Sequence, residues 1–247
     1  MIIDIHAHLP AKDRGIVDKI LDESRRAGIS RICNLGDWPY GATQKQVVSA
    51  NNHTMRFVRW RPDVFVGFCF LNPNHAKSFI FREITRCVEN GNLKGIKLEV
   101  ETNARSKRLD PIMEACARLN IPVLHHAWYK TVGKVLNEST PADIADLAGR
   151  HPNTKIIMAH LTAAGIRGVL DIQSYPNVYV DTSGSQPFSG IIEYAVAALG
   201  AQRILYGSDI IGRDFSCQLG RVYGANINRH DRDLILGINA KKLLRLP

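Results

Sequence analysis

The sequence predicts one α/β domain over residues 1–247, folded as a (β/α)8 TIM barrel. Short apolar runs alternate with longer amphipathic segments from one end of the chain to the other, which is typical of parallel α/β folds. The length of 247 residues suits a single barrel of this kind. Neither a low-complexity linker nor a change in composition divides the chain, so we expect a single domain.

Eight apolar runs rich in β-branched residues are the predicted strands. Their hydrophobicity is continuous rather than alternating, as strands buried on both faces require. The alternation of strand and helix by itself also fits a doubly wound sheet. In chain order the predicted strands cover residues 2–5, 31–35, 64–70, 95–98, 122–126, 155–159, 178–180 and 203–206.

The segments between the strands include five with helical patterns. In the first, Ile16, Val17, Ile20 and Leu21 are spaced for one helical face, and Gly28 follows as a stop signal. In the third, a threonine and a proline at positions 140 and 141 are typical of an N-cap and a first helical residue. The five predicted helices cover residues 13–27, 110–119, 141–150, 191–199 and 232–246.

Composition narrows the class of protein. The 45% hydrophobic and 22% charged content is ordinary for a soluble globular domain, and the five cysteines are too scattered for a disulfide framework. No apolar run approaches the length of a membrane span, so we expect a cytoplasmic protein without membrane contact. The net charge of +9 is spread along the chain without an aromatic-interleaved stripe, so nucleic-acid binding is not expected and a small acidic substrate is favoured.

Histidine and aspartate side chains follow four of the predicted strands. His6 and His8 follow the first, a pair of histidines at 125 and 126 the fifth, His160 the sixth and Asp209 the eighth. In a (β/α)8 barrel the carboxyl ends of the strands meet at one face and carry the reactive groups. We therefore expect these side chains to converge there.

Such a cluster is suited to a divalent metal ion. His6 and His8 are two apart on an extended segment, so both imidazoles point to the same side. Imidazole and carboxylate ligands suit zinc, manganese or iron. The alternative is that these are merely polar residues where strands emerge, and a lone His-x-His pair would not exclude it.

The sequence resembles the amidohydrolase superfamily, in the branch that includes aminocarboxymuconate-semialdehyde decarboxylase. The resemblance runs nearly the whole chain, and the motifs in this order are specific although none is so alone. They are Ile2-Ile3-Asp4-Ile5-His6-Ala7-His8, Gly95-Ile96-Lys97-Leu98, Pro122-Val123-Leu124-His125-His126, Ile156-Ile157-Met158-Ala159-His160, Asn177-Val178-Tyr179-Val180-Asp181-Thr182-Ser183, Arg203-Ile204-Leu205-Tyr206-Gly207-Ser208-Asp209 and Ile235-Leu236-Gly237-Ile238-Asn239-Ala240.

The resemblance implies a role for each of these positions. The metal ligands would be His6, His8, His126 and Asp209, with His126 chosen over His125 because the family's fifth-strand pattern places the ligand there. Asp209 and His160 would be the catalytic acid/base groups. One divalent ion per chain is favoured, zinc first and manganese second.

Lys97 and Glu99, both in or next to the fourth strand, have two possible roles. Some superfamily members bridge two metals with a carboxylated lysine or a glutamate from this strand, whereas an unmodified Lys97 could hold a substrate carboxylate. Trp128 is the second predicted substrate contact, because it follows the fifth strand and can wall the site. Loop cations at Lys130, Arg105 and Arg213 are further candidates; all sit in loops near predicted strand ends.

The predicted activity is that of a metal-dependent hydrolase, in which metal-activated water attacks an ester, lactone or amide of a small anionic substrate. The alternative is a decarboxylase or hydratase of the same superfamily. Two departures from that branch weigh against the decarboxylase: Ile210-Ile211-Gly212 replaces a common Tyr-Pro, and the loops are short.

A second alternative is an inactive metal-binding barrel or a metal-dependent nuclease, although the related deoxyribonucleases carry a Gly-Glu-Ile-Gly-like fourth strand that is absent here. Many members of the resembled branch form pairs, so a homodimer is the expected assembly.

Overall fold

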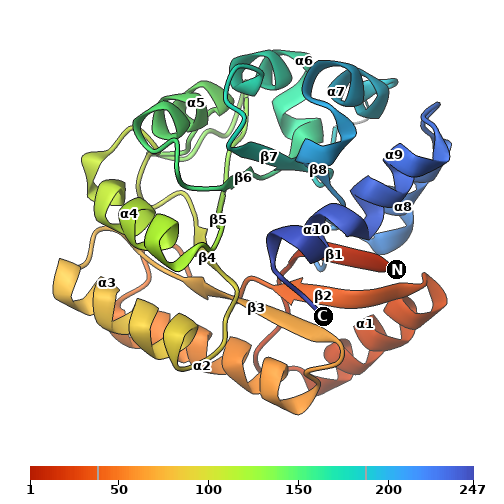
Figure 1. The fold of residues 1–247 in the computed structure, drawn as a ribbon. Helices are drawn as coiled ribbons and strands as arrows, with labels where there is room; N and C mark the ends of the chain where they lie inside the picture. Colours follow the sequence, from red (N-terminus) through yellow and green to blue (C-terminus); the bar gives the residue numbers. More distant parts are fainter. Residues whose placement is uncertain (38, 187) are drawn as a thin grey trace.

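The computed structural model describes residues 1–37, 39–186 and 188–247 and confirms the predicted barrel. Eight parallel strands follow one another around it in chain order, each overlapping its predicted run (Figure 1). They are β1 (Ile2–Ala7), β2 (Ile29–Asn34), β3 (Phe65–Phe70), β4 (Gly95–Leu98), β5 (Val123–His125), β6 (Ile156–Met158), β7 (Val178–Asp181) and β8 (Ile204–Leu205).

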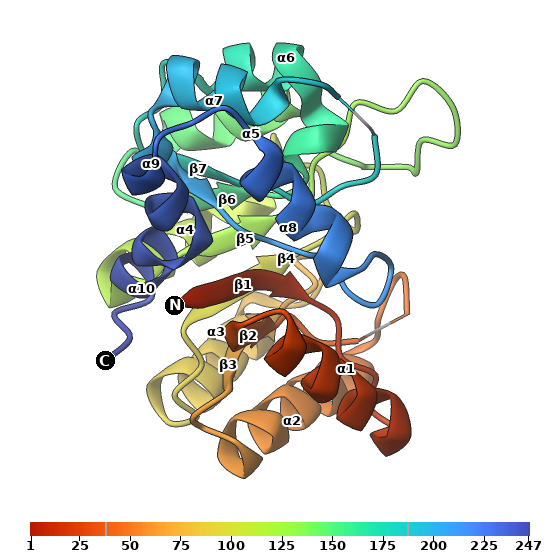
Figure 2. The same cartoon turned by 90° about the vertical axis from the view of Figure 1, so that its right-hand side faces the viewer.

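Helices surround the strands on the outside of the barrel (Figures 1 and 2). They are α1 (Arg14–Arg26), α2 (Gln44–Trp60), α3 (Lys77–Ile84), α4 (Asp110–Leu119), α5 (Pro141–Arg150), α6 (Leu161–Ile172), α7 (Ile191–Leu199), α8 (Phe215–Gly224), α9 (Arg229–Asp233) and α10 (Asn239–Leu243). None of the helices in the described part of the chain is both long and apolar enough to cross a membrane.

Local sequence signals explain several helix boundaries. Asp13 caps α1 by accepting a hydrogen bond from Ile16, and Gly28 follows the helix with φ +72°. Thr140 and Asp143 form a capping box at α5, as the threonine–proline signal predicted.

The predicted helix over residues 232–246 is wrong in its extent. The chain instead forms α9, a π-helical turn over Leu234–Ile238, and the short α10. The helical part begins earlier because the side chain of Asn228 caps α9, and it ends earlier because Arg245 adopts φ +51°. A π-helical turn shifts the helical phase, which a fixed 3.6-residue period does not detect.

The barrel is closed by hydrogen bonds between β1 and the residues that follow β8. The amide of Ile5 donates to the carbonyl of Tyr206 at 2.9 Å, and the amide of Asp209 donates to the carbonyl of His6 at 2.8 Å. The second bond lies just beyond β8, so closure continues into the loop that carries Asp209. Residues from opposite ends of the sequence are thus held in register at the carboxyl end of the barrel.

Apolar side chains fill the inside of the barrel, and α10 covers the end opposite the strands' carboxyl termini (Figure 1). The rest of the core lies between strands and helices. The polar side chains at the strand ends therefore lie at the carboxyl end of the barrel. The inner cluster comprises Ile3, Ile5, Cys33, Leu35, Val66, Phe68, Leu124, Ile157, Ala159 and Leu205, closed off by Ala240, Leu243 and Leu244.

Replacing Gly95 with alanine is expected to destabilise the barrel. A Cβ at Gly95 would overlap the ring of Phe68, which is fully buried in the barrel interior. Overpacking of this kind costs about 1–3 kcal/mol. Gly220→Ala is the matched control, because Gly220 lies in α8 with open space around it and alanine favours a helix by about 1 kcal/mol. Urea unfolding should show a lower free energy of unfolding for Gly95→Ala and a higher one for Gly220→Ala. A Gly95→Ala protein as stable as wild type would contradict the contact between Gly95 and Phe68.

Glu83 of α3 predicts a specific pH dependence of stability. It is buried and accepts hydrogen bonds from Arg86 at 2.7 Å and Asn51 at 3.0 Å. Burial alone raises its pKa, but these bonds outweigh burial and hold the pKa below the ordinary 4.5. The stabilisation is therefore present above about pH 4.5 and is lost as pH falls through the folded-state pKa.

Glu83→Gln should consequently lower the free energy of unfolding at pH 7 by about 1–3 kcal/mol. The difference in free energy of unfolding between wild type and Glu83→Gln should become smaller as the pH is lowered below 4.5. Urea titrations at several pH values measure this, and a gap that stays constant down to pH 3 would assign it to lost packing.

Candidate metal centre

A β-bulge interrupts the middle of β1. Asp4 pairs with Ile32 of β2, and Ala7 pairs with Asn34, so three steps along β1 face two steps along its neighbour. One extra residue is thus inserted in β1. Bulges of this kind redirect side chains and are common beside active sites.

The bulge turns two histidines towards the inside of the barrel. Ile3 and Ile5 belong to the inner apolar cluster, which by strict alternation would put Ala7 inside as well. Ala7 instead packs in the outer layer, so the alternation is reversed after Ile5. His6 and His8 consequently share the inner side, at the carboxyl end of the strand.

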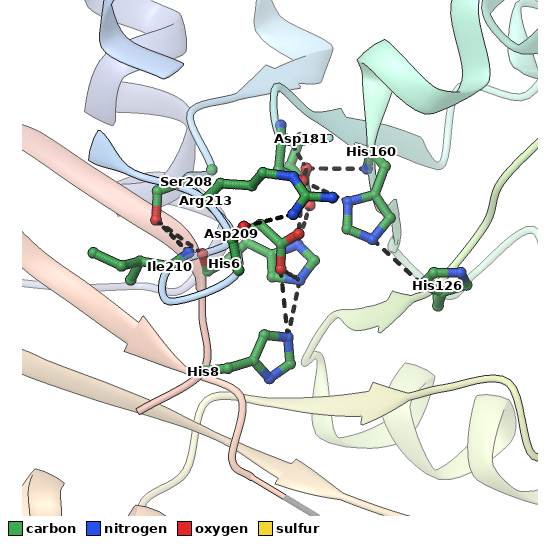
Figure 3. Close-up of polar contacts among 12 residues, drawn as sticks. His6, His8, His126, His160, Asp181, Ser208, Asp209, Ile210 and Arg213 are labelled. Atoms are coloured by element: carbon green, nitrogen blue, oxygen red, sulfur yellow. Dashed lines mark hydrogen bonds and ion pairs between the residues drawn. The ribbon is translucent and has the colours of Figure 1, made fainter. Parts of the chain in front are cut away.

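Three ligand atoms from β1 and the loop after β8 lie close together (Figure 3). The Nε2 atoms of His6 and His8 are 3.3 Å apart, and Oδ1 of Asp209 lies 3.6 Å from the first and 3.8 Å from the second. Two nitrogens and one carboxylate oxygen are a donor set suited to zinc or manganese.

Hydrogen bonds behind the two imidazoles fix which nitrogen faces the cluster. Nδ1 of His6 lies 2.8 Å from Oδ2 of Asp181, and Nδ1 of His8 lies 2.9 Å from the carbonyl oxygen of Gly36. Each Nδ1 therefore carries the hydrogen, since both partners accept, and each Nε2 presents a lone pair. Two lone pairs facing each other at 3.3 Å repel unless a cation lies between them, so the residues fit a bound metal ion.

His160 and His126 continue the cluster towards β5 and β6. The hydroxyl of Ser183 donates to Asp181, so it accepts from Nδ1 of His160 at 2.8 Å and leaves Nε2 of His160 as an acceptor. That Nε2 lies 3.3 Å from Nδ1 of His126, and the rings of His6 and His160 are 4.9 Å apart. The structure thus brings His160 beside the first three ligands, and His126 beside His160.

Asp181 also lies near ligand atoms of His6 and His160, but its carboxylate already accepts several hydrogen bonds. It accepts from Nδ1 of His6 at 2.8 Å, from the amide of His160 at 3.1 Å and from the amide of Ser183 at 3.0 Å. A carboxylate saturated in this way orients ligands rather than binding the ion.

Burial keeps the histidines neutral. Burial and the charge of Lys97 lower the pKa of His6 well below its ordinary value and the pKa of His8 to about 4. Burial, with His6 and His126 nearby, also lowers the pKa of His160 well below 6.5. Neutral imidazoles are the form that binds a metal ion.

Burial raises the pKa of Asp209 to about 6, with smaller opposing effects from Lys97 and Arg213. A carboxylate in this position therefore lacks full compensation by the protein's own charges. A bound cation would favour its ionised form, which agrees with a metal-binding role.

Lys97 and Glu99 form an ion pair inside the barrel. Nζ of Lys97, fully buried, lies 2.8 Å from Oε1 of Glu99, while Oε2 of Glu99 lies 3.6 Å from Nδ1 of His126. Although burial raises the pKa of Glu99, Lys97 and His126 bring it down to about 2. The charge of Lys97 is thus balanced within the site.

The predicted loop contacts divide into two groups. Trp128 lies at the site, with its ring centroid 6.2 Å from that of His126 and 5.3 Å from that of His160. Arg213, in the loop after β8, lies beside Asp209 (Figure 3). The other two cations, Arg105 and Lys130, are paired with Asp143 and Glu138 at 2.7 Å each.

Sequence reasoning missed three residues that support the site: Asp4, Asp181 and Glu138. Asp181 could have been found, because it ends the seventh strand, with Ser183 just beyond it, at the same end of the barrel. Glu138 carried no signal, since it lies in the middle of a polar loop. The neighbouring His125 packs away from the site, fully buried, with Nδ1 on the carbonyl of His126 at 2.7 Å.

A parallel (β/α)8 barrel with a cluster of histidine and aspartate side chains suited to a metal ion at its carboxyl end is typical of metal-dependent barrel enzymes. Within that class the chain belongs to the amidohydrolase family, whose sequence profile matches residues 3–246.

Solved structures share the fold at low sequence identity. A 2,6-dihydroxybenzoate decarboxylase from Rhizobium is 17% identical, with a TM-score of 0.78 over 99% of this chain and 98% of that one. A dihydroxybenzoic acid decarboxylase from Polaromonas with bound manganese is also 17% identical, with a TM-score of 0.78 over 99% and 97%. A 4-oxalomesaconate hydratase from Rhodopseudomonas palustris is 15% identical, with a TM-score of 0.74 over 99% and 96%.

The protein purified with metal supplied is expected to hold about one divalent ion per chain, as for a catalytic site with an open position. The double variant His6→Ala/His8→Ala should lose nearly all of it, because two of the three clustered donors are removed. His230→Ala, an exposed histidine of α9, is the control and should keep it. Elemental analysis measures the ratio. An unchanged metal content in the double variant would place the ion elsewhere, and two ions per chain would assign Lys97 or Glu99 a bridging role.

Proposed function

We propose that the protein is a metal-dependent enzyme that decarboxylates a small unsaturated or aromatic carboxylic acid. The observation that carries this proposal is the cluster of His6, His8 and Asp209 donors beside His160, with cationic groups of Lys97 and Arg213 nearby. The fold is shared with two decarboxylases and a hydratase, which supports placing decarboxylation ahead of the hydrolysis suggested by the sequence.

A divalent ion held by His6, His8, His126 and Asp209 would supply a Lewis acid that polarises a substrate oxygen. Zinc and manganese both suit these ligands, and manganese is the ion bound by the Polaromonas protein.

The protein's own groups would then orient the acid and move a proton. In decarboxylation the carbon–carboxylate bond breaks, its electron pair remains on the substrate carbon, that carbon receives a proton and CO2 leaves. Asp209 and His160 are the groups proposed to carry that proton. Arg213 presents a guanidinium that can hold a carboxylate, and Trp128 offers a flat apolar surface for a planar substrate.

Hydrolysis of an ester, lactone or amide is the second candidate. Ile210 follows Asp209 where the resembled branch often has tyrosine, and the loops are short for a decarboxylase of that branch. The same donor cluster suits activation of water for hydrolysis.

A screen of metal-loaded protein against hydroxybenzoates and unsaturated acids should detect CO2 release. Arg213→Gln should raise KM for these carboxylates by roughly 10-fold, because a charge-assisted hydrogen bond of about 1.5–3 kcal/mol is lost. Arg229→Gln, on an exposed side chain of α9, is the matched control and should change nothing.

Lactones, esters and amides form the second arm of that screen. Turnover there without CO2 release from any acid would overturn the decarboxylase in favour of the hydrolase. No turnover in either arm, by protein shown to hold its metal, would support an inactive metal-binding barrel.

A further inference from the structure

A buried carboxylate stands out in the loop between β5 and α5. The side chain of Glu138 is fully buried, although Val132 and Leu136 of the same loop are 82% and 77% exposed. Burying a charged group costs several kcal/mol unless partners compensate. The groups that contact Glu138 should therefore indicate the role of this buried carboxylate.

Glu138 contacts the candidate metal centre through His126, on the side of the imidazole that faces away from His160. Its Oε1 accepts from Nε2 of His126 at 2.8 Å and from Nζ of Lys130 at 2.7 Å, and its Oε2 accepts from the amide of Val135 at 3.3 Å. The ion pair with Lys130 and the bonds from His126 and Val135 compensate the buried carboxylate, which therefore acts as an acceptor towards His126.

The bond to Glu138 determines which nitrogen of His126 faces the barrel. Since the carboxylate only accepts, Nε2 must carry the hydrogen and Nδ1 keeps its lone pair. Nδ1 lies 3.3 Å from Nε2 of His160 and 3.6 Å from Oε2 of Glu99, both of which are acceptors as well. Three acceptors therefore face one another with no hydrogen between them.

We propose that Glu138 is a positioning residue that holds His126 in its Nε2–H form, so that Nδ1 points at the bound metal ion. The inference rests on the metal-dependent function proposed above. Glu138 stands to His126 as Asp181 stands to His6, each carboxylate bonding the nitrogen that faces away from the cluster. Lys130 balances the charge of Glu138 and is not free to bind substrate.

The proposal differs from a purely structural role, in which Glu138 only fastens the loop through Lys130 and Val135. Loop fastening would leave the tautomer of His126 unchanged. Positioning requires that removing the carboxylate shift the hydrogen on His126 and weaken metal binding. Both effects can be measured without assaying turnover.

The test compares Glu138→Gln and Glu138→Ala with Lys130→Met as the matched control. Zn²⁺ affinity is measured by competition with a chromophoric chelator, and thermal unfolding confirms that each variant folds. Glu138→Ala should bind Zn²⁺ roughly 10–100-fold more weakly, whereas Glu138→Gln, whose amide oxygen can still accept from Nε2 of His126, should lose less affinity. Lys130→Met, which keeps the bond from Nε2 of His126 to Glu138, should leave the tautomer of His126 unchanged and stay within about threefold of wild type in Zn²⁺ affinity.

Nitrogen-15 NMR of histidine-labelled, metal-free protein reports the tautomer, with a His126→Gln spectrum assigning the signal. Wild type should show the Nε2–H form of His126, and the Glu138→Ala protein a mixture. Unchanged tautomer and Zn²⁺ affinity in both Glu138 variants would overturn the proposal, as would an equal loss of affinity in Lys130→Met. If wild type itself binds no Zn²⁺, the metal-dependent function fails, while the tautomer comparison still decides the role of Glu138.

Discussion

The buried carboxylate of Asp4 is the contact on which the candidate site depends. Its Oδ1 accepts from the amides of His6 at 3.0 Å and Ser208 at 2.9 Å, and its Oδ2 accepts from the hydroxyl of Ser208 at 2.6 Å. One side chain thereby fixes the bulge of β1 and joins it to the chain after β8. Because of that junction, His6 and Asp209 lie together although 203 positions separate them in the sequence, counted from 6 to 209.

Near that junction, carboxylates bond the imidazole nitrogens that face away from the cluster, and the other nitrogens face into it. Asp181 bonds the outer nitrogen of His6, Glu138 that of His126, and Glu99 balances Lys97. Hydrogen bonds to carboxylates increase the basicity of the inward nitrogens. The protein thus concentrates lone pairs at one place and pairs Lys97 and Lys130 with carboxylates, an arrangement that favours a bound metal ion over an internal hydrogen-bond network.

The sequence predicted the barrel and the convergence of its polar strand ends because both follow from short-range pattern. Continuous apolar runs identify strands buried on two faces, and parallel topology brings their ends together. What the pattern could not give was side-chain direction. In a strand buried on both faces His125 and His126 are equivalent, and strict alternation from Ile3 and Ile5 gives no sign of the bulge. Glu138, whose carboxylate bonds His126, could not be predicted either, because loop residues follow no periodic pattern of burial.

Backbone strain is located at the same residues. His160 and Asp209 adopt φ +71° and +62°, a conformation that costs a non-glycine residue about 1–2 kcal/mol. Each is held there by the network around the ligands: Asp181 accepts from the amide of His160, and the carbonyl of His6 accepts from the amide of Asp209. Strain of this kind persists only where the surroundings over-determine it, and it is concentrated at functional sites. The hydrogen bonds that orient the candidate metal ligands therefore also hold the two proposed acid/base residues in conformations they would not adopt alone.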